Sequence, residues 1–354
     1  MIRAGSYSLV ATATLILLLI APIAPAGFAQ DATSDPVSLR GAGSTFAAPL
    51  YKQWINDYVP LRPSVSISYD VVGSGEGVRR FLSDAVDFAG SDEILNDAEA
   101  AQAGGAVMIP VTAGMIVIAY NLPGPTSEIR LPRDVYLDIF AGRIRQWDDP
   151  RITAANPGIA LPHRDIVLVA RQDGSGTTAA FVRHLDAMGP SWRSKGMAVG
   201  KLIEWPKGTM LAPGNEGVAL KIRATEGSIG YVEFWYARQQ HLSTATLQNR
   251  AGKFITPTPE AGDLALSGRV AVVKQLDASV ADPATSGAYP IPSYSWLLLY
   301  PHYLDKNKAG ALHDFVEWGL SRRAQDGATQ LGYLPLPADV IGLGKKTLTE
   351  LTTD

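Results

Sequence analysis

One local design occurs three times in this chain: an apolar strand, a glycine-rich turn that carries a hydroxyl, and an amphipathic helix. The strands are predicted at VSLR (37–40), SVSISYDVV (64–72) and DIVLVAR (165–171), and the turns that follow are GAGSTF, GSGEG and QDGSGTT. After each turn, apolar residues recur at the spacing of a buried helix face. Strands that alternate with helices predict an α/β fold with mostly parallel sheets flanked by helices.

Other apolar segments extend this pattern. Residues 114–121 and 227–237 are predicted as buried strands, the second with a helical continuation, and residues 293–301 as a further strand. A single helix is predicted over residues 313–331, with an apolar face through Phe315, Val316 and Leu320. The Pro-, Gly- and Ser-rich stretch 277–292 is typical of a crossing between lobes.

The three turns have the composition of an anion site. A helix start offers unpaired N–H groups and the positive end of the helix dipole, and glycines let the backbone approach a ligand. We expect hydroxyl donors from Thr45, Ser74, Ser175 and Thr177, and N–H donors from Phe46, Gly176 and Thr177. The alternative for any one turn is plain helix capping, because Ser and Thr favour helix starts.

Charged residues lie next to these turns. Arg171 precedes the third turn and has the planar geometry that grips an oxyanion, although a surface salt bridge is its alternative role. Asp173 is positioned to orient Arg171 or to accept a proton from a ligand. Asp92, in DFAGSD, is the second acidic candidate, with a helix cap before EILNDAEA as its alternative role. A carboxylate beside an anion site favours a ligand that carries a proton, such as hydrogen phosphate, over sulfate.

Composition restricts the remaining possibilities. The formal net charge of −3 does not resemble that of a basic nucleic-acid-binding protein, and the lack of cysteine excludes disulfides and thiolate metal sites. Residues 1–29 have the pattern of a cleaved signal peptide, with Arg3, an apolar core and small residues ending at Ala29; a membrane anchor is the alternative. We therefore expect an exported protein.

The sequence motifs give little support for an enzyme. The third turn lacks the lysine of a GxxxxGK[ST] phosphate loop and does not match the GxSxG nucleophile elbow. The five histidines show no paired metal-binding spacing, and His184 is the one candidate for a base near the third turn. A phosphatase or phosphoryl-handling hydrolase remains the alternative function, and binding of another oxyanion, such as sulfate or molybdate, is a further one.

In order and spacing, residues 40–340 resemble the phosphate-binding proteins of bacterial phosphate ABC transporters, with DFAGSD and RxDGSGT as the most specific motifs. The resemblance implies a two-lobed periplasmic-binding-protein fold with a two-strand hinge, which we place as lobe I (36–113 and 290–354) and lobe II (114–289). It implies a periplasmic monomer that is not an enzyme, that closes over one inorganic phosphate without cofactor or metal, and that delivers it to an inner-membrane permease.

Residue by residue, the resemblance implies phosphate contacts from all three turns. They are Thr45, Phe46, Ser74, Asp92, Arg171, Asp173, Ser175, Gly176 and Thr177. Asp92 would take the proton of the phosphate, and Arg171 would form the ion pair, held by Asp173. Glu76 departs from the family pattern, which has a small residue there, and we expect its side chain to point to solvent or to the opposite lobe.

Overall fold

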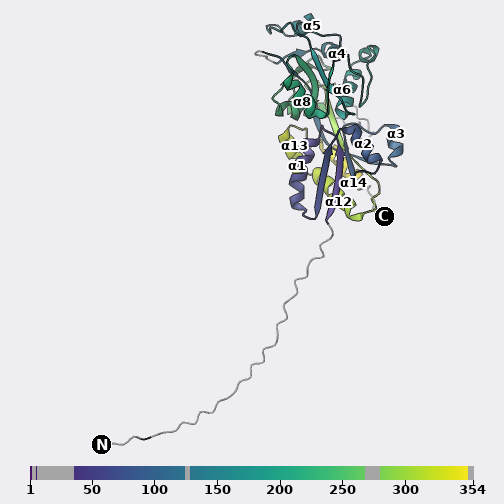
Figure 1. Ribbon diagram of the computed structural model, residues 1–354, viewed down its shortest axis with the longest axis vertical. Coiled ribbons are helices and arrows are strands. Elements are labelled where there is room, and N and C mark those ends of the chain that lie inside the picture. The colour runs from purple at the N-terminus through teal and green to yellow at the C-terminus, as the bar shows by residue number, and fades with distance from the viewer. Residues whose placement is uncertain (2–4, 6–35, 124–127, 268–279, 350–354) are drawn as a thin grey trace. The chain divides into compact units, whose positions relative to one another are not determined.

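Strand β4 links two halves of one nine-stranded sheet in the computed structural model, which describes residues 1, 5, 36–123, 128–267 and 280–349. Helices lie around both halves (Figure 1). The strand order is β2 (Val65–Val71), β1 (Val37–Gly43), β3 (Phe88–Ser91), β12 (Pro292–Leu299), β4 (Val107–Asn121), β8 (Ser228–Glu233), β6 (Val167–Arg171) and β7 (Met210–Ala212), with β9 (Ser243–Thr244) also on β4.

Pairing directions separate the middle of the sheet from its flanks. The strands that precede the three turns pair in parallel, β1 with β2 and β3 and β6 with β7 and β8. Strands β4 and β12 run antiparallel to each other and to their other neighbours. Parallel strands place their carboxyl ends at one edge, so the flanks bring their turns to common edges.

The change of partner along β4 defines the two halves. Residues 107–115 pair with β12, and residues 116–121 pair with β8. We call β2, β1, β3, β12 and the first part of β4 the first half, and the remaining strands the second half. The chain passes between the halves at Met115–Ile116 and again before β12, where the Ile116 N–H donates to the Ile291 carbonyl at 2.9 Å.

Helices follow most strands. Those around the first half are α1 (Ala48–Tyr58), α2 (Ser74–Leu82), α3 (Asp97–Gln102), α12 (Lys306–Gly319), α13 (Arg322–Leu331) and α14 (Ala338–Leu348). The others are α4 (Arg133–Phe140), α5 (Pro150–Ala155), α6 (Gly176–Ala187), α7 (Ser191–Ser194), α8 (Gly214–Ala224), α9 (Phe234–Gln239) and α10 (Pro259–Leu266). A small sheet, β11 (Phe254–Ile255), β10 (Thr246–Gln248) and β5 (Arg130–Leu131), and a 3-10 turn (Val59–Leu61) complete the described elements.

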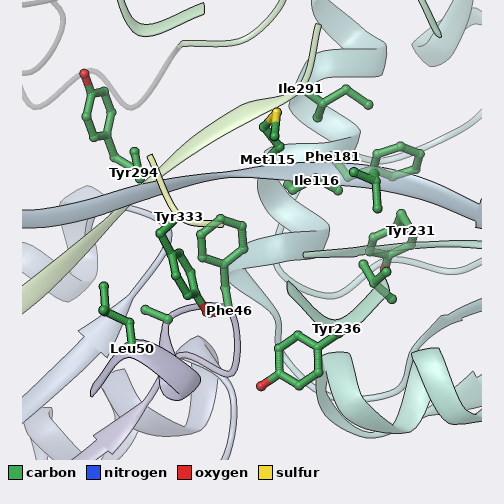
Figure 2. Close-up of a cluster of buried hydrophobic side chains, with 14 of the residues drawn as sticks. Phe46, Leu50, Met115, Ile116, Phe181, Tyr231, Tyr236, Ile291, Tyr294 and Tyr333 are labelled. Atoms are coloured by element: carbon green, nitrogen blue, oxygen red, sulfur yellow. Dashed lines mark hydrogen bonds between the residues drawn. The ribbon is translucent and has the colours of Figure 1, made fainter. Parts of the chain in front are cut away.

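Helix α1 illustrates why the predicted helices form. Pro49 lies in its first turn, where the missing N–H costs nothing, and the apolar residues Leu50, Tyr51, Trp54 and Tyr58 recur at helical spacing and are buried. The core continues across β4 to Phe181 and Tyr231, whose rings stack at 4.5 Å between centroids (Figure 2). One apolar core therefore supports the turns of both halves.

Two sequence predictions need correction. The single helix predicted over residues 313–331 is wrong, because α12 ends at Gly319 and Ser321 caps a new helix by accepting the Ala324 N–H. The strand predicted at 114–121 begins earlier, at Val107, with Pro110 beside a β-bulge where the proline lacks a ladder donor. The strand-to-helix change predicted within 227–237 is confirmed by β8 and α9.

Two predictions fall partly or wholly on residues that the structure does not describe. The signal peptide lies in residues 1–29, and the crossing segment 277–292 is described from residue 280. Among the helices in the described ranges, none combines the length and the apolar composition that a membrane span requires.

Candidate anion-binding site

The first turn, residues 41–46, joins β1 to α1 and is held by two tyrosines. The Tyr236 hydroxyl donates to the Thr45 carbonyl at 2.7 Å, and the Tyr333 hydroxyl donates to the Phe46 carbonyl at 2.6 Å. A trans peptide points its N–H opposite to its C=O, so the Phe46 N–H is directed away from Tyr236. The turn is buried, with Thr45 4% and Phe46 0% exposed.

The second turn (73–77) and the third turn (172–178) are in direct contact. The Gly75 N–H donates to the Gly174 carbonyl at 2.8 Å. A Cβ on Gly176 would lie 2.5 Å from the Ser74 Oγ and 2.8 Å from the Asp92 Cβ, so any larger residue would separate the two turns. Gly73 has φ +90°, and its missing Cβ makes room for the Asp173 carboxylate. The second and third turns therefore meet in the folded chain, which no local sequence pattern could establish.

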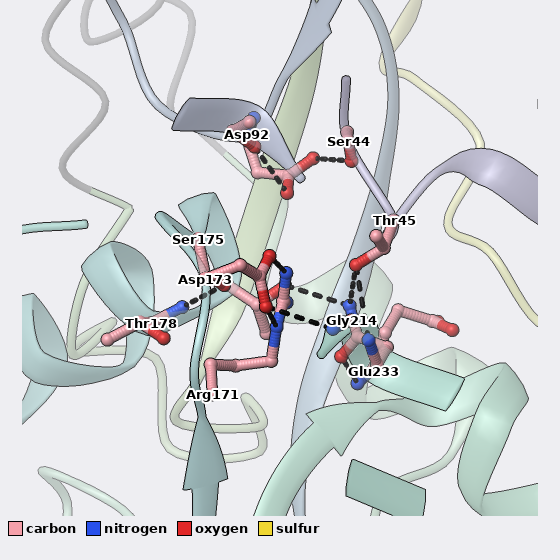
Figure 3. Close-up of polar contacts among 12 residues, drawn as sticks. Ser44, Thr45, Asp92, Arg171, Asp173, Ser175, Thr178, Gly214 and Glu233 are labelled. Carbon is pink, nitrogen blue, oxygen red and sulfur yellow. Dashed lines mark hydrogen bonds and ion pairs between the residues drawn. The ribbon is translucent and has the colours of Figure 1, made fainter. Parts of the chain in front are cut away.

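Arg171 ends β6 at the base of the third turn and is 2% exposed. Its Nε donates to Asp173 Oδ1 at 2.9 Å and its Nη2 donates to Asp173 Oδ2 (Figure 3). Its Nη1 lies 3.5 Å from the Thr177 Oγ1. The alternative of a surface salt bridge is excluded by burial. This bidentate pair fixes the guanidinium and leaves its Nη1 side directed toward the third turn.

Asp173 is kept ionised by its partners. Burial raises the pKa of its carboxyl, but the hydrogen bonds and charge of Arg171, with the Gly214 N–H at 2.9 Å, more than offset this and lower the pKa below its usual range. Asp173 is therefore the counter-ion that orients Arg171.

Asp92 directly follows β3 and is 2% exposed. Ser44 and Ser295 donate to its Oδ1 at 2.5 and 2.8 Å, and Ser74 donates to its Oδ2 at 3.3 Å. Burial raises the pKa of Asp92 to about 6, although these hydroxyls and the charge of Arg171 act in the opposite direction. The alternative role as a helix cap belongs to Asn96, which forms a capping box with Glu99 at the start of α3.

The third turn starts α6, with Ser175 as the N-cap. Its Oγ accepts the Thr178 N–H at 3.0 Å, so the hydroxyl does cap the helix, as the alternative proposed. Gly176 and Thr177 are the first two helical residues, and such positions have N–H groups without a partner inside the helix. The turn thus combines a cap with two N–H donors at the positive end of the α6 dipole.

A fourth turn, which the sequence pattern does not reveal, also lies in this site. Asn215 and Gly214 start α8 after the three-residue strand β7, in the segment PGNEG. The Asn215 Nδ2 donates to the Oγ1 atoms of both Thr45 and Thr177, at 2.9 and 3.0 Å. The glycine between a strand and a helix was the available signal, but β7 is too short to show a strand pattern.

Glu76 does not point toward Asp92 or Arg171. Its carboxylate accepts from Arg79 and Arg80 at 2.7–2.8 Å, one turn further along α2, and its side chain is 33% exposed. Hydrogen bonds from Arg79 and then Arg80 lower the pKa of Glu76 to about 2. Its outward position agrees with the expectation that it points to solvent.

His184, the candidate base, has a different partner. Its Nε2 lies 2.9 Å from the Tyr136 hydroxyl, its ring stacks on Tyr136, and burial lowers its pKa to about 4. Ser175 and His184 thus do not form a nucleophile–base pair. Within the described residues, no group of three or more His, Cys, Asp or Glu side chains is arranged to hold a metal ion.

The chain is similar to known proteins over most of its length. A family model described as a PBP superfamily domain matches residues 30–323. The phosphate-binding protein PstS of Haemophilus influenzae is 34% identical over 306 residues, covering 86% of this chain and 90% of that protein. The PstS of Methanocaldococcus jannaschii is 32% identical over 359 residues, covering 93% and 92%.

Solved structures show the same fold. A high affinity periplasmic phosphate-binding protein (PfluDING) bound with phosphate aligns with a TM-score of 0.72 and 22% identity, over 88% of this chain and 93% of that one. An ABC-type phosphate transport receptor from Vibrio cholerae aligns with a TM-score of 0.56 and 15% identity, over 84% and 100%. At these identities the likeness concerns the fold.

Proposed function

Because the chain belongs to the PBP superfamily and, within it, to the phosphate-binding proteins PstS, we propose that it captures inorganic phosphate and delivers it to an ABC-transporter permease. It would act in the periplasm after removal of residues 1–29. The observation that carries the proposal is the position of Asp92, a buried carboxylate, within reach of the charge of Arg171 and beside three converging turns.

The proposed ligand contacts divide by chemistry. Donors to the phosphate oxygens are Arg171, the hydroxyls of Thr45, Ser74, Ser175 and Thr177, and the N–H groups of Phe46, Gly176 and Thr177. The Ser74 hydroxyl, which donates to Asp92 in this structure, would turn to the phosphate when the anion binds. Asp92 accepts the proton of hydrogen phosphate. Sulfate has no proton to offer, so it would face the Asp92 carboxylate unpaired and repelled, and the site would discriminate against it.

We propose that binding closes the lobes, 36–113 with 290–354 against 114–289, by rotation at the two crossings beside β4 and β12. Four contacts between these segments support this. They are Gly75 with Gly174, Thr45 with Asn215, Glu93 with Arg183, and Glu99 with Lys201. Donors from both lobes would replace the hydration shell of the anion, and the permease would recognise the closed form.

Calorimetric titration of residues 30–354 with inorganic phosphate tests the proposal. We expect one phosphate per chain at pH 8 and much weaker binding of sulfate. Equal affinity for the two anions would refute the role of Asp92, and no binding of phosphate would refute the function. Turnover of a phosphate ester that is lost on changing Ser175 would establish a hydrolase instead.

A further inference from the structure

Asn215 joins the two threonine hydroxyls of the candidate site. It lies at the second position of α8, is 0% exposed, and belongs to the segment proposed as lobe II. Its Nδ2 donates to the Thr45 Oγ1 at 2.9 Å and to the Thr177 Oγ1 at 3.0 Å, and its own N–H donates to the Thr45 Oγ1 at 3.2 Å. One amide thus contacts a hydroxyl from each proposed lobe.

The orientation of this amide is fixed by a fourth contact. The Glu233 N–H donates to the Asn215 Oδ1 at 3.0 Å. A backbone N–H is only a donor, so the atom facing it must be the amide oxygen, and the NH₂ group must face the threonines. Glu233 is the last residue of the buried strand β8, so the N–H group that orients the Asn215 amide is held in a fixed position.

Counting lone pairs determines what the two hydroxyls do. A hydroxyl has one O–H donor and two acceptor lone pairs. The Thr45 Oγ1 accepts two N–H groups of Asn215, and the Thr177 Oγ1 accepts from Asn215 and, at 3.5 Å, from the Arg171 Nη1. Both hydroxyls have therefore used their acceptor sites, and each proton is left to be donated to another group.

We infer that Asn215 is a positioning residue that makes Thr45 and Thr177 act as donors to the bound anion, which rests on the proposed function. Neither hydroxyl then accepts the proton of hydrogen phosphate, and this proton goes to Asp92. Because Thr45 and Asn215 lie on different proposed lobes, the Thr45 hydroxyl takes this orientation only when the lobes are closed. Through Asn215, closure of the lobes thus determines that the threonine hydroxyls donate hydrogen bonds to the anion and do not accept them.

A double-mutant cycle between Asn215→Ala and Thr45→Val tests the inference, with phosphate affinity measured by calorimetry at pH 8. In the wild-type background we expect Asn215→Ala to weaken phosphate binding about tenfold or more. In the Thr45→Val background, where there is no hydroxyl to orient, the same change should weaken binding at most about threefold, through Thr177.

Asn249→Ala is the matched control, because Asn249 is equally buried but bonds to Lys253, Ser286 and Ala288. It should leave phosphate affinity within about twofold of wild type.

Equal weakening by Asn215→Ala in both backgrounds would overturn the inference, since the asparagine would then act through the fold alone. Failure of the wild type to bind phosphate would instead refute the proposed function. If Asn215→Ala does not fold, Asn215→Asp serves in the same cycle, because it keeps the acceptor for the Glu233 N–H while offering acceptors to both threonines. It should lose more affinity than Asn215→Ala, and Thr45→Val should reduce that loss; no reduction would overturn the inference.

Discussion

Asp92 and Asp173 are two carboxylates of one site in opposite surroundings. Asp173 faces a guanidinium and a backbone N–H, and its pKa is lowered. Asp92 is buried just after β3 and faces three serine hydroxyls, and its pKa is raised to about 6. The same side chain is thus a counter-ion in one place and, in our proposal, the acceptor of the phosphate proton in the other, and the partners of each carboxylate determine its role.

Removal of Arg171 should have the largest effect on phosphate affinity, because it breaks the ion pair that keeps Asp173 in its role as a counter-ion. Arg171→Ala leaves the Asp173 carboxylate partly buried without its cation and removes the positive charge from the site. We expect phosphate affinity to fall by about 3–5 kcal/mol, as measured by calorimetry. Arg322→Ala is the control, because the Arg322 side chain is 94% exposed, and it should leave affinity unchanged. A loss below about tenfold for Arg171→Ala would show that Arg171 does not contact the anion.

The pH dependence of stability should differ in sign between the two carboxylates. The folded pKa of Asp92 is above its unfolded value, so its stabilising contribution is complete below about pH 4 and is lost as pH rises through about 6. Relative to Asp92→Asn, the ligand-free wild type should lose up to about 3 kcal/mol of unfolding free energy over this range. Denaturant unfolding at several pH values measures the difference.

Asp173 should show the reverse. Its folded pKa is lowered, so its contribution is present above the unfolded pKa and is lost as pH falls through the folded value. Relative to Asp173→Asn, the wild type should therefore lose stability on acidification. A wild-type protein whose stability changes in parallel with that of both variants at all pH values would contradict the assignment of opposite shifts.

Glu76 is a third carboxylate near the site, and its removal should have the smallest effect on phosphate affinity. It lies in the second turn but pairs with Arg79 and Arg80 on its own helix. Glu76→Gln should change phosphate affinity by less than about twofold, since surface ion pairs contribute little. A clear gain of phosphate affinity on removing this charge would mean that Glu76 repels the anion and acts on the site as a third carboxylate.

The parts predictable from the sequence are those that depend on short segments. Each of the three turns is a contiguous strand–glycine–helix pattern, and so their positions, and the pairing of Arg171 with Asp173 two residues away, could be recognised. Ser295 could not, because it lies in the apolar strand β12 and meets Asp92 203 residues away in the chain. Asn215 was missed because β7 has three residues, and the break after Gly319 was missed because apolar periodicity continues through it.

The most direct test of the account compares Asp92→Asn with Asp173→Asn by titrating each with phosphate and with sulfate at pH 8. Asp92→Asn removes the acceptor for the phosphate proton, so we expect the preference for phosphate over sulfate to fall by about tenfold or more. Asp173→Asn acts through Arg171, which both anions share, and should change both affinities by the same factor. If Asp92→Asn leaves the preference unchanged, or if Asp173→Asn alone reduces it, the division of roles between the two carboxylates is wrong.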